Sequence, residues 1–263
     1  MKPVVSKRHF SKKSLTLLDS ISSASYCAPN QHWGKRMGKI FAVANQKGGS
    51  GKTTITLNLA GAFSHESPDS RILVVDTDSQ NTATRASGAG ETRYPFAVAN
   101  LAAAGKGLGR EIQRFASDYD LVLVDCPPSV DNHNTETVVG IADFVLVPMD
   151  ASVVDAWSTQ GMLQLVRRLV GPDSTKCGIV FNRVNTKTIA YSEISEIMSE
   201  GNPYPILKST IALREVYKTA IGTGTTVFTV KGQRSTKQAR DEIMSVALEM
   251  LGIMGLMENS ENE

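Results

Sequence analysis

The stretch at residues 47–54, Lys-Gly-Gly-Ser-Gly-Lys-Thr-Thr, constrains the fold of this chain more than any other. An apolar run at residues 39–45 precedes it and predicts a buried strand, and residues 55–63 carry apolar side chains at helical spacing. A glycine-rich turn between a strand and a helix is the context of a phosphate-binding loop. Glycines let successive backbone N–H groups point at one anion, and the helix N-terminus adds partial positive charge. Lys52 can reach β- and γ-phosphates, and the Thr53 hydroxyl can ligate Mg²⁺.

Two further predicted strands end in carboxylates. Residues 71–76 predict a strand that ends at Asp76, with Asp78 two residues later, and residues 120–125 predict another that ends at Asp125 before Cys-Pro-Pro-Ser. Ligands bind outside the carboxyl ends of strands in open parallel sheets. An acid at the end of an apolar strand can hold Mg²⁺ through water, so these strands predict a metal site beside the loop. The other interpretation of Asp76 and Asp78 is a turn with a helix cap.

The rest of the chain alternates strands with helices. It predicts one α/β domain at residues 39–257, a doubly wound, mainly parallel sheet with helices on both faces. Residues 81–118 are harder to interpret and carry no functional prediction. The further strands are predicted at residues 143–148 and 176–182, with a short one flanked by Pro203 and Pro205, and the further helices at residues 110–115, 157–170, 188–199, 210–220 and 235–254.

Charge is unevenly distributed over a chain whose net charge is only +2. Residues 1–38 hold seven Lys/Arg and one acidic residue, and residues 208–240 hold the same numbers. Two basic segments on an otherwise acidic body favour a polyanionic partner, although basic side chains also simply solvate a surface. We interpret residues 1–38 as a mobile basic arm that either binds nucleic acid or is only a solvated tail, and residues 258–263 as a frayed acidic tail.

The sequence carries no signal for a membrane or an oxidising compartment. It has no run of about 18 apolar residues, and its basic start lacks an apolar segment long enough for a signal peptide. Cys27, Cys126 and Cys177 form no C-x-x-C pair, which argues against a disulfide framework or a cysteine-ligated metal. These observations predict a cytoplasmic protein with reduced thiols.

Taken together, the motifs resemble those of the ParA/MinD superfamily of deviant Walker A ATPases, and most closely the small ParA-type partition ATPases. The loop has Lys47 five residues before Lys52, and Gln46 stands where the usual phosphate loop has its first glycine. The segment Asp-Thr-Asp-Ser-Gln at residues 76–80 and the later Asp-Cys-Pro-Pro follow in the family's order, with Ser79 in place of the family's proline. The resemblance covers nearly all of the predicted domain and implies a P-loop NTPase fold.

The resemblance implies an enzyme that hydrolyses ATP with Mg²⁺ as a homodimer that sandwiches two nucleotides. It implies that Lys47 reaches the partner's phosphates as a fixed positive charge, that Lys52 neutralises charge on the same phosphoryl group, and that Asp78 orients the attacking water. It places Asn182 against the adenine, although a loop-capping role is the alternative. The implied residues are Lys47, Lys52 and Asp78 for catalysis, Lys47, Gly48, Gly49, Ser50, Gly51, Lys52, Thr53, Thr54 and Asn182 for nucleotide binding, and Thr53, Asp76 and Asp125 for metal.

The same resemblance implies a role in DNA segregation, as in plasmid or chromosome partition. It implies that the ATP-bound dimer binds DNA non-specifically and that a ParB-like centromere-binding or adaptor protein stimulates hydrolysis that is weak alone. The implied location is cytoplasmic and nucleoid-associated. Such DNA contacts go to phosphates and carry no sequence information. The residues implied for DNA binding are Lys208, Arg214, Lys218, Lys231, Arg234, Lys237 and Arg240.

Other functions stay open from the sequence. The same machinery could position another cargo, such as a conjugation complex, a carboxysome or a chemotaxis array, and a module that binds nucleotide without hydrolysing it is a different class. A MinD-like membrane switch would need a basic face on the last helix, but residues 245–257 carry acid and no Lys or Arg. An iron–sulfur carrier ATPase would need paired cysteines. The sequence therefore predicts no membrane partner.

Overall fold

The computed structural model describes residues 37–90, 93–200 and 202–256. These residues form a sheet in the order β3-β2-β4-β1-β5-β6, in which every neighbouring pair is parallel, so the predicted fold class is confirmed. The strands are β1 (Lys39–Val43), β2 (Ile72–Asp76), β3 (Ala97–Asn100), β4 (Leu121–Asp125), β5 (Phe144–Met149) and β6 (Cys177–Phe181). The helices are α2 (Lys52–Glu66), α3 (Thr82–Ala89), α4 (Leu108–Asp118), α5 (His133–Ile141), α6 (Val153–Val170), α7 (Ile189–Ser199), α8 (Glu215–Gly222) and α9 (Thr236–Ile253), with short 3₁₀ turns at Gly105–Gly107 and Ser174–Lys176.

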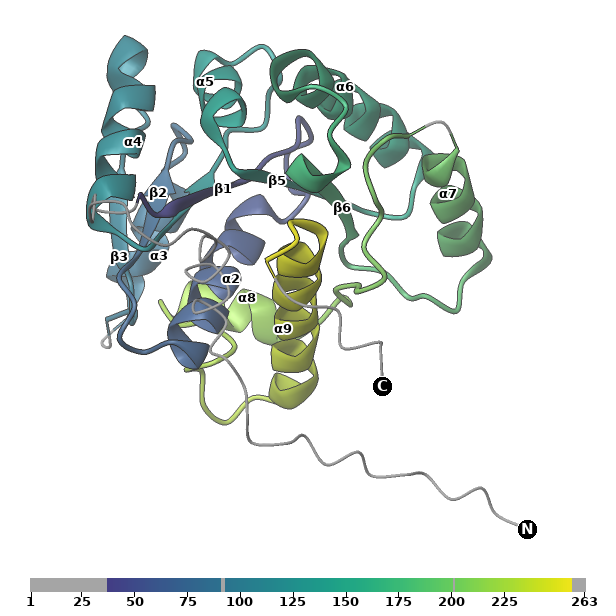
Figure 1. Cartoon of the computed structure of the whole chain (residues 1–263). Helices are drawn as coiled ribbons and strands as arrows, with labels where there is room; N and C mark the ends of the chain where they lie inside the picture. The colour runs from purple at the N-terminus through teal and green to yellow at the C-terminus, as the bar shows by residue number, and fades with distance from the viewer. Residues whose placement is uncertain (1–36, 91–92, 201, 257–263) are drawn as a thin grey trace, which may run out of the picture.

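Helices cover both faces of the sheet (Figure 1). One hydrophobic cluster packs α2, α3, α8 and α9 against the sheet, and a second packs α4, α5, α6 and α7 against the opposite face. Successive strand residues point to opposite faces, so Phe41 and Val43 belong to the first cluster while Ala42 and Ala44 belong to the second. Because both faces are covered, the strands are apolar at nearly every position and show no alternation.

The sheet brings the predicted site residues to one edge. In the register of β2 and β4, Asp76 lies opposite Asp125, and Val43 at the end of β1 lies opposite Asp125 as well. The chain leaves β1 toward α2 on one face and leaves β4 toward α5 on the other. Such a change of face between neighbouring strands is where ligands bind in open α/β sheets.

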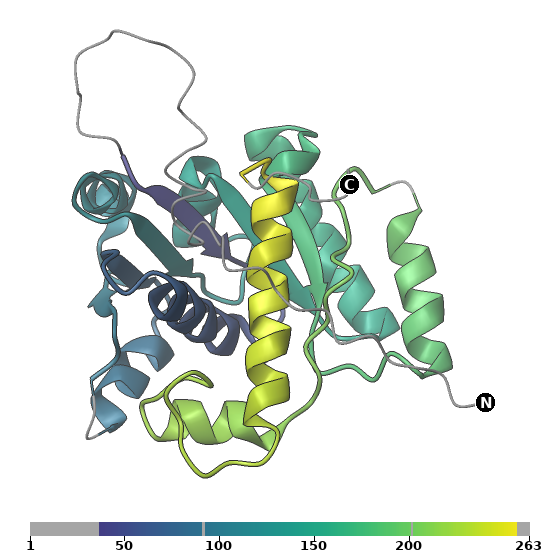
Figure 2. The same ribbon diagram turned by 60° about the horizontal axis from the view of Figure 1, so that its bottom comes forward.

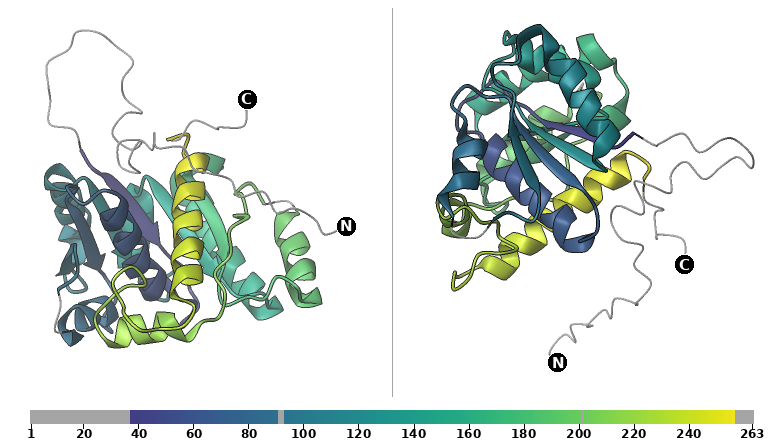
Figure 3. Two further views of the ribbon diagram at one scale, coloured as in Figure 1. Left: turned by 90° about the horizontal axis from the view of Figure 1, so that it is seen from below. Right: turned by 90° about the vertical axis from the view of Figure 1, so that its left-hand side faces the viewer.

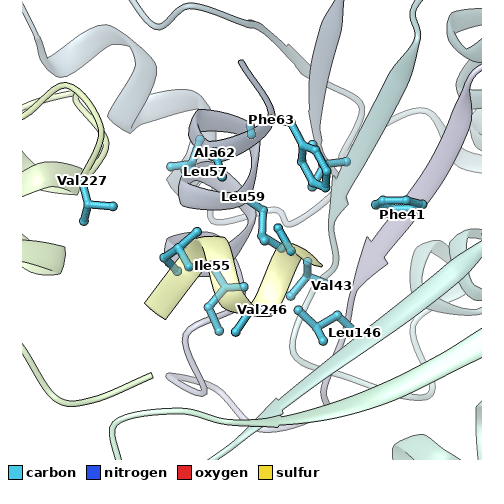
Figure 4. Packing of buried hydrophobic residues seen from close by; sticks show 14 of the residues in the cluster. Phe41, Val43, Ile55, Leu57, Leu59, Ala62, Phe63, Leu146, Val227 and Val246 are labelled. Atoms are coloured by element: carbon cyan, nitrogen blue, oxygen red, sulfur yellow. The ribbon is translucent and has the colours of Figure 1, made fainter. Parts of the chain in front are cut away.

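Helix α2, which begins at the end of the glycine-rich loop, is buried on almost all sides. The ring of Phe63 packs 6.1 Å from that of Phe41 in β1 (Figure 4). Helix α9 packs against α2, and the two helices lie next to each other in the views of Figures 2 and 3. Burying one such large apolar side chain contributes about 1.5–3 kcal/mol, so the core fixes the helix on which the loop depends.

The helix predicted at residues 210–220 is wrong in its first turn. Residues 206–214, here called the extended segment, form isolated parallel bridges to β6 and its end, from Ile206 to Ile179 and from Ile211 to Asn182. Helix α8 begins only after this segment, and the short strand expected near Pro203 and Pro205 is reduced to the first of these bridges.

Two carboxylates of α9 explain why the extended segment is not helical. Glu249 accepts hydrogen bonds from the backbone N–H groups of Lys208 and Ser209, at 2.6 and 2.8 Å. Glu242 accepts one from the N–H of Ala212 at 3.4 Å and others from the guanidinium of Arg214. These acceptors satisfy backbone N–H groups of the extended segment and so hold it against α9 in its extended form.

The two predicted tails are for the most part not described. The predicted basic arm at residues 1–38 falls outside the described residues except for Met37 and Gly38, and the predicted acidic tail at residues 258–263 falls wholly outside them. Within the described ranges, none of the helices has both the length and the apolar character that crossing a bilayer requires.

Candidate functional site

The glycine-rich loop joins β1 to α2 through two left-handed backbone positions. Gly49 has φ +78° and Gly51 has φ +95°, conformations that residues with a Cβ rarely adopt. Gly51 is also the N-cap of α2, and the Asn182 amide lies against it and donates to the Ser50 carbonyl at 2.8 Å. The end of β6 therefore braces the loop from the side, through a residue predicted to contact the nucleotide.

Replacing Gly51 by alanine is expected to distort this loop. A Cβ at Gly51 would meet the Asn182 amide nitrogen at 2.2 Å, and the backbone would hold a strained φ, so we expect a loss of about 2–4 kcal/mol in the free energy of unfolding. Gly48→Ala is the matched control, because a Cβ there meets nothing within 4 Å. Chemical denaturation of both variants measures the difference. Equal stability of the two variants would contradict this account of the loop.

The two residues after Gly51 direct their polar atoms at the edge of the sheet. Lys52 is buried, and its Nζ donates to the Lys47 carbonyl at 3.1 Å. Burial lowers the pKa of Lys52, an effect that the nearby Asp125 carboxylate partly opposes. The Thr53 hydroxyl donates to Asp125 Oδ2 at 2.6 Å, which joins the loop to the end of β4.

The three predicted carboxylates differ in what surrounds them. Asp125 is fully buried, and its Oδ1 has no hydrogen-bond partner among the described residues; burial raises the pKa of this side chain to about 7. Both oxygens of Asp76 are engaged, with Thr84 donating its N–H and its hydroxyl at 2.9 Å. Asp78 is partly exposed and accepts the Gln80 N–H at 2.9 Å.

This donor set fits Mg²⁺. Thr53 and Asp125 supply hard oxygen atoms, and one buried oxygen of Asp125 accepts no hydrogen bond from the described residues. No group of three or more His, Cys, Asp or Glu side chains in the described ranges is arranged to hold a metal by itself. Mg²⁺ typically binds one or two protein oxygens together with waters and substrate phosphates, which is the kind of partial site found here.

A pocket of about 440 Å³ opens beside these groups. Its floor is the loop and the start of α2, and its wall is the second half of the extended segment with the start of α8. The predicted site residues that line it are Gly48, Gly49, Gly51, Lys52, Thr53, Thr54, Asp78 and Asn182, joined by Arg214 and Lys218 from the basic segment. The pocket therefore gathers most of the predicted nucleotide-binding residues in one place.

Lys47 is the exception among the predicted catalytic residues. It does not line the pocket, and its Nζ instead lies 2.7 Å from Asp155 Oδ2 in the first turn of α6. The sequence reasoning missed Asp155. A signal was present, since Ser152-Val-Val-Asp155 has the spacing of a helix-capping box and the Ser152 hydroxyl does accept the Asp155 N–H at 3.1 Å.

The predicted DNA-binding residues divide into two groups. Arg214 and Arg240 are engaged within the molecule: Arg214 pairs with Glu242, and Arg240 donates to the carbonyls of Val227 and Phe228 at 2.6 and 3.0 Å. The remaining five side chains are exposed, and Lys218 lies 3.5 Å from Glu215 on α8. These five are Lys208, Lys218, Lys231, Arg234 and Lys237.

Sequence reasoning also missed two pairings at the pocket wall, each made by a residue that lines the pocket. Tyr217 of α8 donates its hydroxyl to Glu242 at 2.9 Å, and burial raises the pKa of Tyr217 strongly. Arg183, in a left-handed conformation after Asn182, lines the pocket and pairs with Asp150. No motif spacing links these pairs, since each partner comes from a distant part of the chain.

Curated relatives align with most of this chain. The maintenance of carboxysome distribution protein A of Halothiobacillus neapolitanus is 29% identical over 213 residues, 80% of this chain and 95% of the relative. The chromosome partitioning protein ParA of Myxococcus xanthus is 28% identical over 208 residues, 61% of this chain and 71% of the relative. Both support the motif-based resemblance.

Solved structures share the fold. Apo McdA of Cyanothece superposes with a TM-score of 0.63 at 21% identity, covering 80% of this chain and 99% of that one. Cobyrinic acid a,c-diamide synthase of Mycobacterium smegmatis was solved with an ATP analogue and magnesium. It superposes with a TM-score of 0.63 at 21% identity, covering 81% of this chain and 94% of that one. The profile of the CobQ/CobB/MinD/ParA nucleotide binding domain matches residues 41–227. The chain therefore belongs to the CobQ/CobB/MinD/ParA family of nucleotide-binding domains.

Proposed function

We propose that this protein is an ATP-dependent dimerisation switch that hydrolyses ATP to ADP and phosphate. The observation that carries the proposal is the opposite placement of the two loop lysines. Lys52 lies in the pocket beside Asp125, while Lys47 points away from its own pocket toward α6. A lysine outside its own site is available to a second copy, as expected for a nucleotide shared across a dimer.

Each residue of the site has a role in this proposal. The loop N–H groups and Lys52 bind the phosphates, Asn182 contacts the adenine, and Asp78 orients the attacking water. Thr53 and Asp125 hold Mg²⁺, with Asp76 anchoring its shell through water. Bound Mg²⁺ neutralises charge on the β- and γ-phosphates. Support comes from solved structures that share this fold, one named as a complex of a McdA variant with ATP and one as a synthase with an ATP analogue and magnesium.

Lys47 is proposed to act in the facing subunit. As a fixed positive charge beside the partner's phosphoryl group, it would stabilise charge that develops in the transition state. The proposal makes the homodimer the active unit, with each subunit supplying Lys52 and Asp78 to its own site and Lys47 to the other.

We further propose that the ATP-bound dimer binds DNA non-specifically and moves a cargo over the nucleoid with a ParB-like or adaptor partner. Plasmid or chromosome partition is one such cargo, supported by the ParA relative. A second candidate is carboxysome positioning, favoured by two proteins named for maintenance of carboxysome distribution whose alignments span 95% and 94% of their lengths. Release of phosphate from ATP, measured with and without DNA, separates both from a module that binds nucleotide without hydrolysing it.

The DNA contacts can be tested on three exposed residues that precede or begin α9. Replacing Lys231, Arg234 and Lys237 together by alanine is expected to weaken ATP-dependent DNA binding and to lower the slope of log affinity against log salt by about 2–3. Fluorescence anisotropy of a labelled duplex over a salt series measures both quantities.

The matched control removes three exposed basic residues from another part of the chain, Arg85, Lys106 and Arg110, on α3 and near the start of α4. This control variant lowers the net charge by the same amount as the first triple variant but leaves residues 208–240 unchanged. Equal losses of affinity and slope in the two triple variants would mean that only total charge attracts the DNA, and the proposed contact surface would be withdrawn.

A further inference from the structure

Val227 is bound by two side chains that come from different helices. It lies in the connection between α8 and α9, residues 223–235, here called the basic loop, and is fully buried in the first hydrophobic cluster (Figure 4). Its N–H donates to Asn58 Oδ1 of α2 at 2.8 Å, and its carbonyl accepts the Nε–H of Arg240 of α9 at 2.6 Å. Side chains therefore satisfy both backbone groups of this buried residue and fix the basic loop between the two helices.

Arg240 joins the two ends of the stretch that carries the exposed basic residues. Its guanidinium also donates to the Phe228 carbonyl at 3.0 Å, so one side chain binds two successive carbonyls, 13 and 12 residues earlier in the chain. Residues 231–235, between these carbonyls and α9, are all exposed and include Lys231 and Arg234. The planar fork of an arginine suits such a two-carbonyl contact, which the ammonium of a lysine cannot reproduce.

Asn58 joins the basic loop to the helix of the nucleotide pocket. It is fully buried on α2, and its Nδ2 donates at 2.7 Å to the carbonyl of Thr54, which lines the pocket. Three residues further along α2, a Cβ on Gly61 would meet Thr226 Oγ1 at 2.7 Å, so the helix also packs tightly against the residue before Val227. The basic loop is thus held by the same helix that begins at the phosphate-binding loop.

We propose that Arg240 is a positioning residue for DNA binding and that Asn58 supports it. Together they hold the basic loop in the arrangement in which Lys231 and Arg234 contact DNA phosphates. This inference rests on the proposed function, in which the ATP-bound dimer binds DNA non-specifically. It differs from the sequence prediction that Arg240 contacts DNA itself, because the Arg240 guanidinium is engaged by two carbonyls of its own chain.

This role predicts a loss of DNA affinity without a loss of phosphate contacts. Arg240→Lys keeps the charge but removes the fork that binds both carbonyls. A basic loop that adopts the binding arrangement only part of the time weakens the apparent affinity by that fraction, while its basic side chains still contact phosphates once bound. We expect ATP-dependent affinity to fall about three- to tenfold, at an unchanged slope of log affinity against log salt.

Fluorescence anisotropy of a labelled duplex, with excess ATP and Mg²⁺ over a salt series, measures both quantities. Arg240→Gln, which also removes the charge, should lose at least as much affinity at the same slope. Affinity equal to that of the parent protein in Arg240→Lys would overturn the inference. A slope lowered by about 0.9 in Arg240→Gln would overturn it as well, because that change marks a direct phosphate contact.

Arg168→Lys is the matched control, because it makes the same change at another arginine that is bound within the molecule. Arg168 donates to Glu136 at 2.6 Å and lies on α6, which packs on the opposite face of the sheet. Its DNA affinity should equal that of the parent protein. An equal loss in Arg168→Lys and Arg240→Lys would show a general effect of replacing arginine, and the inference would be withdrawn.

Nucleotide binding separates the failure of this inference from that of the proposed function. Arg240 does not line the pocket, so the Arg240 variants should bind a fluorescent ATP analogue as the parent does. A parallel loss of nucleotide affinity would mean that Arg240 supports the whole fold, and the inference alone would fail. If the parent protein shows no ATP-dependent DNA binding, the proposed DNA binding fails and the inference falls with it.

Amide hydrogen exchange of the nucleotide-free protein tests the hold on the basic loop directly. Arg240→Lys and Asn58→Ala should each speed exchange over residues 226–235 by about tenfold or more, while the amides of β1 and β4 exchange as in the parent. The Arg240→Lys measurement stands alone if Asn58→Ala folds poorly. Unchanged exchange in Arg240→Lys would show that the basic loop does not depend on this side chain, and would overturn the inference.

Discussion

Lys52→Ala is expected to reduce nucleotide affinity by at least about a hundredfold, the largest binding effect at this site. Lys52 is buried at the floor of the pocket, and its ammonium is held at the loop by the Lys47 carbonyl. Removing it takes away the main positive charge available to the β- and γ-phosphates, and alanine offers no replacement. Equilibrium titration with a fluorescent ATP analogue measures the loss.

Lys187→Ala serves as the control, since Lys187 is an exposed lysine between β6 and α7 and does not line the pocket. Its affinity should equal that of the unmodified protein. Circular dichroism of Lys52→Ala should show an intact fold, because the one hydrogen bond that Lys52 Nζ makes among the described residues is to a backbone carbonyl of the loop. Unchanged nucleotide affinity in a folded Lys52→Ala protein would mean that residues 47–54 are not the phosphate site.

Mixing Lys47→Ala with Asp78→Ala is expected to restore hydrolysis that neither variant has alone. Asp78→Ala should still bind ATP and dimerise but hydrolyse little, because orienting water matters in the transition state and not in binding. In a mixed dimer, the Asp78→Ala subunit lends its Lys47 to a site that keeps its own Asp78. One site in each mixed dimer is then complete.

The expected recovery can be estimated from the symmetry of the dimer. At equal concentrations about half of the dimers are mixed, and each has one complete site of two, so the mixture should reach about a quarter of the unmodified rate. Phosphate release measures the rate, and cross-linking with tagged subunits counts the mixed dimers. Mixed dimers without recovered activity would place Lys47 in its own subunit's site and remove the basis of the sandwich dimer.

Most of the fold was predictable because the buried strands are easy to recognise in the sequence. Five strands, β1, β2, β4, β5 and β6, are buried on both faces and appear in the sequence as continuous apolar runs. The glycine-rich loop after β1 and the carboxylates at the ends of β2 and β4 helped to identify these strands. Strand β3 was not predicted, since it is a short edge strand whose residues are exposed or half-buried and carry no such run. The start of α8 was misplaced because the carboxylates that hold the extended segment, Glu242 and Glu249, lie some 30 to 40 residues further along the chain.

Some features of the site could be predicted from local motifs, while others depend on residues that are far apart in the chain. Gly51, Lys52, Thr53 and Asp125 were predictable because each belongs to a short motif whose spacing follows from phosphate and metal chemistry, and the structure gathers them at one edge of the sheet. The pairing of Lys47 with a residue 108 positions away was not, because nothing in the spacing of two charged residues says that folding will bring them together.

The two carboxylates of α9 tie the pocket wall to the helix whose first turn carries the exposed Lys237. Glu242 and Glu249, which lie about two turns apart on one face of α9, both accept hydrogen bonds from the extended segment. The pocket wall and the helix are therefore expected to move together. A wall that shifts against a bound molecule must carry α9 with it or break hydrogen bonds to charged acceptors, each worth about 1.5–3 kcal/mol. Lys237 lies in the first turn of the same helix, about 7.5 Å along its axis from Glu242, so a shift of the wall that carried α9 would also move this exposed lysine.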